Sequence, residues 1–263
     1  MMRLILRNWT LSLGLGLLAL ILLMALSAPI LYPGDPYAMM GPPLQWPGTY
    51  PGAPLGTDSL GRDIAAGIFH GARVSLMVGF VSVACALVVG ILVGAFAGYY
   101  GGWGDDALMR ITELFQTIPQ FMLAIVIIAI MGPSIQAVII SLGVVSWPTV
   151  ARLVRSEFLV LRERAFVHSC IVIGMSDLRI IFAQILPNAL SSITVMASVL
   201  VATAILMESA LSFLGFGDPN VITWGTMIGL GRSRELLCVQ LLLNGLNAGL
   251  DVWFAGVLGM GVR

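Results

Sequence analysis

The segment Arg164–Asn188 has the sequence RAFVHSCIVIGMSDLRIIFAQILPN, and the rest of the chain is organised around it. Apolar residues recur at helical spacing through Phe166–Ile173, and Gly174 interrupts that pattern. A second amphipathic run covers Asp177–Leu186 and is closed by Pro187. The sequence therefore predicts a compact knob (Arg164–Asn188) in which two short helices meet at a glycine.

The composition indicates an integral membrane protein. Of the 263 residues, 59% are hydrophobic and only 10% are charged, and the mean hydropathy is +1.00. A soluble domain carries about a quarter charged residues. The net charge of +0 excludes a basic nucleic-acid-binding surface, so we expect no nucleic acid partner. The cysteines Cys85, Cys170 and Cys238 fit no metal-ligand spacing, and we expect no metal site and buried thiols.

Six apolar stretches are long enough to cross a hydrocarbon core, which needs about 20 residues per helix. They are Leu11–Leu31, Leu76–Tyr99, Leu108–Met131, Ile135–Val150 with a few flanking residues, about Ala189–Leu214, and Leu236–Leu258. Glycines at positions 90, 94 and 98 of the second stretch predict one closely packed helix face. The expected fold is an all-α membrane protein with six transmembrane helices in a single domain, residues 1–263.

The segments between the spans differ in character. Tyr32–Pro54 contains seven prolines and is predicted to be an extended loop. Ile64–Val74 is predicted to be a short amphipathic helix at the membrane surface. Pro119 and Pro148 lie inside predicted spans, where we expect them to kink the helices.

The distribution of arginine predicts the orientation, because loops rich in basic residues stay in the cytoplasm. With six spans, residues 151–188 share one side with both termini, and that side carries nine of the 13 arginines. Residues 1–10 and the 151–188 loop are therefore expected in the cytoplasm. Residues 32–74 and 215–235 are expected to face outward.

Five stretches resemble one protein family. In chain order they are LGTDSLGRD (Leu55–Asp63), ARVSL (Ala72–Leu76), GYYGGWGD (Gly98–Asp105), MSDLRIIFAQILPNAL (Met175–Leu190) and ESALSFLGFG (Glu208–Gly217). Together with Gly174, they resemble the permease subunits of bacterial ABC importers, which carry a cytoplasmic "EAA" loop. More narrowly, the chain resembles the second permease of the dipeptide/oligopeptide/nickel importer family, over about Leu11 to Gly231.

The resemblance implies a type I ABC importer permease in the bacterial inner membrane and not an enzyme. A second homologous permease would complete the pathway as a heterodimer, and an extracytoplasmic binding protein would deliver the substrate. Two cytoplasmic ATPase subunits would use ATP and Mg, so this chain itself would hold no cofactor. Peptide is the expected substrate, and nickel or another metal chelate is the alternative.

The resemblance makes the knob a coupling helix between spans four and five, seated on an ATPase. The coupling residues expected from it are Phe166, Val167, His168, Ser169, Cys170, Gly174 and Asp177. We expect Phe166 and Val167 to be exposed apolar anchors, and Ser176 and Asp177 to cap the second helix. His168 stands where the family has glutamate, which leaves open a different polar partner on the ATPase or a solvated, cap-contacting histidine.

Glu113 and Glu208 are the carboxylates closest to the membrane interior, and either could line the translocation path. Glu113 follows Arg110 at i,i+3 spacing, so a structural ion pair near the cytoplasmic edge is its alternative. Glu208 has no partner in the sequence, and a helix-to-helix hydrogen bond is its alternative.

The loop before Ile64 contains a second group of charged residues. Asp58 or Ser59 is expected to cap the helix that follows, while the charges of Arg62 and Asp63 stay solvated. Binding of the delivery protein by Asp58, Arg62 and Asp63 is the alternative.

Two other functional classes fit the residues less well. The chain contains no HExxH, GxSxG, CxxC or glycine-rich phosphate loop. Its histidines, His70 and His168, lie outside the predicted spans on opposite sides, which argues against an intramembrane serine protease. An ion-coupled secondary transporter would typically show repeated halves, and this sequence has no internal repeat.

Overall fold

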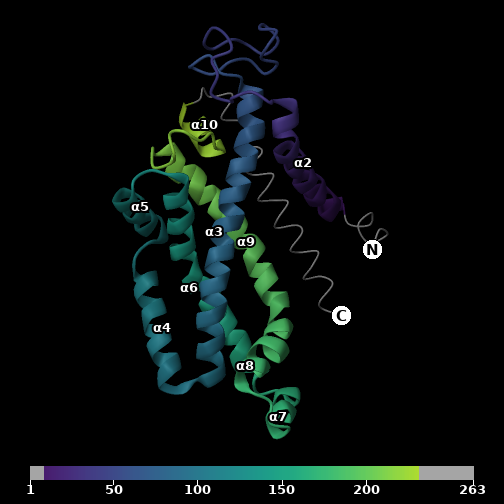
Figure 1. The fold of residues 1–263 in the computed structure, drawn as a ribbon, viewed down its shortest axis with the longest axis vertical. Helices are drawn as coiled ribbons and strands as arrows, with labels where there is room; N and C mark the ends of the chain where they lie inside the picture. The colour runs from purple at the N-terminus through teal and green to yellow at the C-terminus, as the bar shows by residue number, and fades with distance from the viewer. Residues whose placement is uncertain (1–8, 231–263) are drawn as a thin grey trace. The chain divides into compact units, whose positions relative to one another are not determined.

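The structure is a computed structural model in which residues 9–230 are described. The predicted sixth span, Leu236–Leu258, and most of the predicted cytoplasmic N-terminus lie outside these residues. The regular secondary structure of residues 9–230 is helical, which confirms the predicted all-α class (Figure 1).

The described elements follow the chain in a simple order. They are α2 (Trp9–Leu31), α3 (Ile64–Tyr100), α4 (Gly102–Thr117), α5 (Gln120–Met131), α6 (Ile135–Leu161), α7 (Ala165–Val172), α8 (Asp177–Arg179), the π-helix η1 (Ile180–Ile185), α9 (Leu186–Phe213) and α10 (Trp224–Leu230). Three helical stretches among the described residues are long and apolar enough to cross a membrane: α3, α6 and residues 177–213. The α4–α5 pair passes the same test as a fourth, bent span. The count of six spans stays a prediction.

Helix α3 joins two elements that were predicted separately. The expected surface helix Ile64–Val74 and the expected span Leu76–Tyr99 are parts of one 37-residue helix. No proline lies in this stretch to stop the helix. Ile64, Ile68 and Ala72 are buried, so the first part of α3 packs against protein and does not lie on a surface.

The predicted third span, Leu108–Met131, is broken. Helices α4 and α5 meet at an angle of 85°. Ile118 between them has extended dihedrals, φ −87° and ψ 130°, because a residue that precedes proline is driven out of the helical region. Pro119 therefore breaks the span, whereas Pro148 lies within the continuous helix α6.

The two elements around the knob also differ from the prediction. Helix α6 continues past Val150 to Leu161, so the predicted 151–188 loop begins only at Arg162. The second knob helix does not end at Pro187, because α8, η1 and α9 form one continuous stretch. The wide π-helical turn of η1 lies just before the proline, where a regular turn would clash with its ring and lack its N–H.

The described residues form two compact units, each of which is treated separately. Unit 1 comprises the chain up to Phe80, Ile127–Ile139, and the part from Val201 onward. Unit 2 comprises Val81–Val126 and Ile140–Leu200. It contains α4, α7, α8 and η1, together with parts of α3, α5, α6 and α9.

The predicted glycine face of α3 packs on α6 within unit 2. A Cβ atom added at Gly90 would stand 2.5 Å from Cβ of Val150, and one at Gly98 would stand 2.6 Å from Cβ of Phe158. Real Cβ contacts are not that short, so the two helices approach each other only because these residues are glycines. The prediction of a close packing face is confirmed.

Gly94→Val is expected to destabilise unit 2 by about 2–3 kcal/mol. The added Cβ would overlap the backbone carbonyl oxygen of Ala151, which cannot move aside as a side chain does. Thermal unfolding of the purified chain measures the loss. Gly104→Val in α4 is the control, because no heavy atom lies within 4 Å of a Cβ placed there. Equal melting temperatures for the two variants would contradict the packing argument.

Candidate functional site

Helix α7 ends in a well-defined turn. The N–H of Met175 donates to the carbonyl of Cys170, and the N–H of Gly174 donates to the carbonyl of Ile171, both at 3.0 Å. This pair of bonds is the Schellman motif, in which a left-handed residue terminates a helix. Gly174 supplies that conformation with φ +77°. The predicted glycine junction between the knob helices is confirmed.

The side of α7 that faces the protein is not the one expected. Val167 is only 1% exposed and belongs to the core of unit 2, together with Phe158, Ile180 and Ile185. The prediction that Val167 is an exposed anchor is wrong, because this residue holds α7 to its support. Phe166 is 37% exposed.

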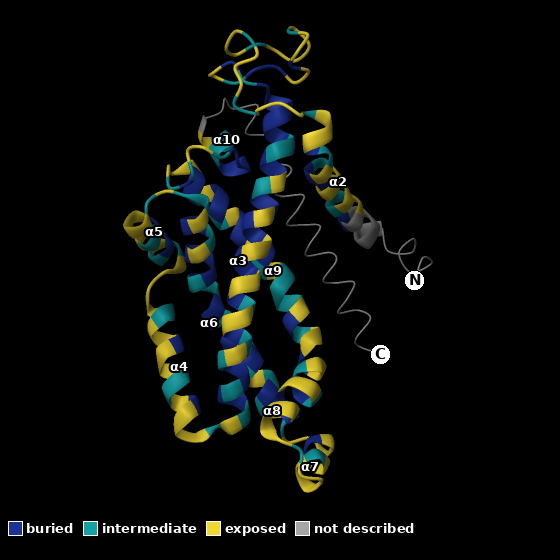
Figure 2. Cartoon of the chain, in the orientation of Figure 1, coloured by how far each residue is buried: buried dark blue, intermediate teal, exposed yellow. Residues whose placement is uncertain are grey.

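The most exposed apolar side chains of the knob lie at the end of α7. Val172 is 86% exposed and Ile173 is 74% exposed, and Ile171 beside them is also exposed. Figure 2 shows exposed residues over much of α7. His168 and Ser169 lie exposed on the same helix, and Cys170 is half-buried. The hydroxyl of Ser169 donates to the carbonyl of Ala165 at 3.0 Å within the helix.

Polar contacts fix the knob and the residues just before it to the carboxyl end of α3. The Tyr99 hydroxyl donates to Oδ1 of Asp177 at 2.8 Å. Nη1 of Arg162 donates to the carbonyls of Gly98, at 3.1 Å, and Tyr99, at 3.4 Å, where a cation is favoured by the helix dipole. Ser176 occupies the cap position of α8 without a side-chain cap bond, so the predicted side-chain capping is not found there. Asp177 contacts α3 through Tyr99.

A bidentate ion pair braces the same unit. Nε and Nη2 of Arg155 donate to Oδ1 and Oδ2 of Asp105 at 2.5 and 2.6 Å. Asp105 is buried at the start of α4, and Arg155 belongs to α6. In the sequence, Arg155 is recognisable only as one of the predicted cytoplasmic positive charges. The paired geometry instead fixes α4 against α6.

The two candidate path carboxylates have different surroundings. Glu113 is exposed and accepts from Nη1 of Arg110 at 3.1 Å, which confirms the i,i+3 pair. Glu208 is only 1% exposed inside unit 1. It accepts from the hydroxyls of Ser75, at 3.2 Å, and Ser212, at 2.7 Å. The bond from Ser75 joins α3 to α9, so the predicted helix-to-helix alternative is confirmed, while a path role for either carboxylate stays a prediction.

The cap of α3 is Asp63, not Asp58 or Ser59. Oδ1 of Asp63 accepts from the N–H of Ala65 at 2.9 Å, and Asp63 is buried, not solvated. The pKa of Asp63 is raised above its ordinary value, mainly because the carboxyl group is buried. Oδ1 of Asp58 instead accepts from the backbone N–H groups of residues 60 and 62 and closes a turn of the loop.

Comparison with known proteins identifies the family. Residues 90–240 match the family described as the inner membrane component of binding-protein-dependent transport systems. The chain belongs to this family. The match covers the knob and the third, fourth and fifth predicted spans, including α6 and α9. The sequence-based prediction of a membrane transport permease is therefore confirmed.

Several curated relatives are permeases. The chain is 42% identical to a dipeptide transport system permease protein, DppC, of Alkalihalophilus pseudofirmus, over 85% of this chain and 73% of the relative. It is 38% identical to a glutathione transport system permease protein, GsiD, of Pectobacterium atrosepticum, over 80% of this chain and 70% of the relative. It is 35% identical to a di/tripeptide transport system permease protein, DppC, of Pseudomonas aeruginosa, over 95% of this chain and 85% of the relative.

A solved structure shares the fold. An inward-facing structure of the MetNI methionine ABC transporter aligns with a TM-score of 0.62 over 73% of this chain and 95% of that chain, at 21% identity. The likeness confirms the ABC importer permease fold. The family places the chain among the inner membrane components of transport systems that depend on a binding protein.

Proposed function

We propose that the chain is a permease subunit of an ATP-driven importer for short peptides, paired with a second, homologous permease. The observation that carries this proposal is the 42% identity, over 85% of the chain, to a permease named for dipeptide transport. The other relatives described above are named for di/tripeptides and glutathione. These names favour peptides over nickel or another metal chelate, and over ion-coupled transport.

The proposal gives the knob the role of the ATPase contact. The proposed coupling residues are still Phe166, Val167, His168, Ser169, Cys170, Gly174 and Asp177. Some of them contact the ATPase, and others hold α7 in position. Exposed Phe166, His168 and Ser169 face the partner, together with the apolar end Ile171–Ile173. Val167, Gly174 and Asp177 hold α7 on unit 2. ATP and Mg²⁺ act in the two partner subunits, and the arginine count supports a cytoplasmic position for the knob and both termini.

Rigid support is what makes the knob suited to transmit motion. The Schellman turn fixes α7 relative to α8, and the bond from Tyr99 to Asp177 fixes the knob to the end of α3. Arg162, just before the knob, bonds to the same end of α3. When the ATPases close on ATP, a displacement of α7 is passed to the spans as a rigid-body movement.

Gly174→Val is expected to uncouple ATP hydrolysis from uptake. Valine at φ +77° is strained by about 1–3 kcal/mol, and no atom lies within 4 Å of the added Cβ, so the effect is on the turn alone. The ratio of ATP hydrolysed to peptide imported is the measurement. Gly174→Asn is the matched control, because asparagine tolerates the left-handed conformation. Unchanged uptake in the valine variant would show that the turn is incidental.

Reconstitution tests the proposed function. We expect uptake of L-alanyl-L-alanine into proteoliposomes that contain this chain, a second permease, both ATPases and the binding protein, and we expect it to need ATP. A cysteine introduced by His168→Cys should cross-link to an ATPase in a nucleotide-sensitive manner. Uptake by the chain driven by an ion gradient alone would reject the permease proposal, and a missing cross-link would reject the docking site.

A further inference from the structure

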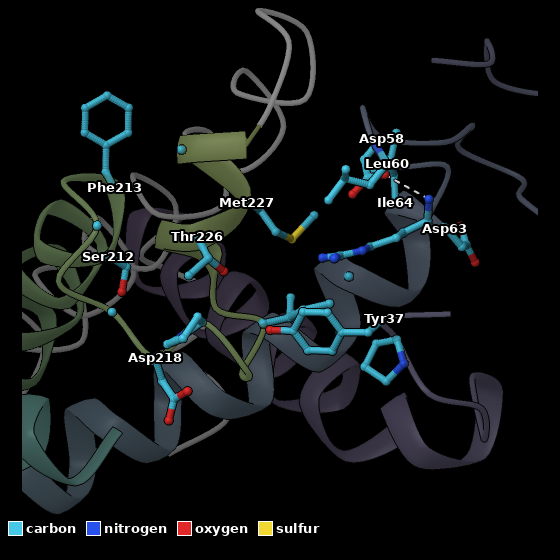
Figure 3. A pocket seen from close by; sticks show the side chains of 18 residues that line it. Tyr37, Asp58, Leu60, Asp63, Ile64, Ser212, Phe213, Asp218, Thr226 and Met227 are labelled. Carbon is cyan, nitrogen blue, oxygen red and sulfur yellow. Dashed lines mark hydrogen bonds between the residues drawn. The ribbon is translucent and has the colours of Figure 1, made fainter. Parts of the chain in front are cut away.

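Unit 1 contains a half-open cavity beside the loop that precedes α3. Its volume is about 390 Å³, within the range of about 300–1,000 Å³ that is typical of small-molecule sites. Tyr37, Arg62 and Asp63 line it from the loop side, and Asp218 and Met227 line it from the segment after α9 (Figure 3). On the proposed orientation this cavity faces outward, far along the chain from the knob.

Arg62 brings to this cavity a guanidinium with one nitrogen that is unpartnered within the described part of the chain. Its Nε atom is buried and has no hydrogen-bond partner among residues 9–230. Its guanidinium carbon lies 4.6 Å from the centre of the Tyr37 ring. The Asp58 turn fixes the backbone, because Oδ1 of Asp58 accepts from the N–H of Arg62 at 2.8 Å. A guanidinium held in this way presents a fork of donors that matches a carboxylate.

The opposite charge is supplied by carboxylates that backbone groups hold in place. Asp218 accepts from the N–H of Asn220 at 2.9 Å and from the N–H of Ile135 at 3.2 Å. Asp58 accepts from two N–H groups through Oδ1. An ionised carboxylate offers about four acceptor positions, so both residues keep positions for a further donor. In Figure 3 the ring of Tyr37 is seen between Asp58 and Asp218.

The Tyr37 hydroxyl is kept neutral in this surrounding. Burial raises the pKa of Tyr37 to about 12, the charge of Asp218 adds to the shift, and Arg62 opposes it. A phenol is protonated at neutral pH and can donate a hydrogen bond, and the raised pKa extends this to more alkaline solution. The cavity therefore offers a cation, a neutral hydroxyl and carboxylates to one small ligand.

We propose that this cavity binds a small zwitterion, with the ligand carboxylate on Arg62 and its ammonium group toward Asp58 and Asp218. Free amino acids and short peptides have this chemistry, and the choice of a peptide as ligand rests on the proposed function. The cavity itself does not depend on that function, because α7 contributes nothing to it. A carboxylate side chain of the binding protein could supply the anion that binds Arg62 in place of the carboxylate of a small ligand.

Equilibrium dialysis of radiolabelled L-alanyl-L-alanine against the full chain in lipid nanodiscs, without binding protein, tests the site. We expect saturable binding that Arg62→Gln weakens by about tenfold or more, since the charged bond to the carboxylate is lost. Arg73→Gln is the matched control, because Arg73 is exposed on α3 and does not line the cavity. Melting temperatures of both variants show whether either change alters the fold.

Ligand analogues test the same site without any change to the protein. N-acetyl-dialanine lacks the ammonium group and dialanine amide lacks the carboxylate, and each should bind about tenfold more weakly than dialanine. Absence of saturable dialanine binding, equal affinity for the three ligands, or no effect of Arg62→Gln would each overturn the proposal.

Three further outcomes separate the possible sources of the carboxylate and the two proposals. If Arg62→Gln weakens docking of the binding protein while dialanine does not bind the chain, the cavity takes a protein carboxylate and the zwitterion site is overturned. ATP-driven dialanine uptake without binding to this chain would overturn the site and leave the proposed function intact. Saturable, Arg62-dependent binding without ATP-driven uptake of any peptide would support the site and overturn the proposed function.

Discussion

Val172→Asp is expected to reduce ATP-driven dialanine uptake by about tenfold or more, while the chain keeps its fold. Val172 is 86% exposed at the end of α7, between the exposed residues Ile171 and Ile173. A carboxylate there remains in water in the free chain, so the free energy of unfolding changes little. In the docked complex the same carboxylate would lose its water inside an apolar contact, which is strongly unfavourable.

The matched control is the same substitution five residues earlier on the same helix. Val167 is 1% exposed and packs in the core of unit 2. Val167→Asp buries an unpaired carboxylate and is expected to destabilise the chain by about 3 kcal/mol or more. Melting temperature and uptake should therefore separate the two variants. Normal uptake with Val172→Asp would show that Ile171–Ile173 is not the docking surface.

Copurification distinguishes loss of docking from loss of coupling. Val172→Asp should lose the ATPase subunits from the purified complex, because it changes the contact surface itself. Gly174→Val leaves that surface intact and is expected to retain them while it uncouples hydrolysis from uptake. Retention of the ATPases by both variants would assign Val172 a coupling role without a docking role.

Sequence patterns predicted local structure well where one strong physical signal acts. The lengths of the apolar stretches predicted helices α2, α6 and α9. The four-residue spacing of glycines predicted the face of α3 that packs on α6. Periodicity defines the faces of a helix but does not say which face is inside, so Val167 was assigned to the wrong side. The length of α3 was missed because two neighbouring patterns, one amphipathic and one apolar, continue in a single helix.

The long-range contacts that brace the two units internally could not have been predicted from the sequence. Asp105 and Arg155 are 50 residues apart, Tyr99 and Asp177 are 78 apart, and Ser75 and Glu208 are 133 apart. Hydrogen-bond partners at such separations are decided by tertiary packing, and neither spacing nor periodicity carries a signal for them. Glu208 was recognised as a buried acid, but its partner was not.

Glu208→Ala is expected to lower the free energy of unfolding by about 3 kcal/mol. The substitution leaves the buried hydroxyls of Ser75 and Ser212 without their acceptor and creates a cavity between α3 and α9. The effect should spread to α10, because Oγ of Ser75 also accepts from the N–H of Trp224 at 3.2 Å. Thermal unfolding in detergent measures the loss.

Glu208→Gln decides between a structural role and a role in the translocation path. Glutamine keeps the length of the side chain and one acceptor oxygen, so the expected loss of stability is under about 1 kcal/mol. Both carboxylate oxygens of Glu208 already accept hydrogen bonds inside unit 1, and the residue is almost fully buried. We therefore expect uptake to follow stability, near normal in the glutamine variant and low in the alanine variant. A glutamine variant that melts like the original chain but imports dialanine poorly would place the charge of Glu208 on the path.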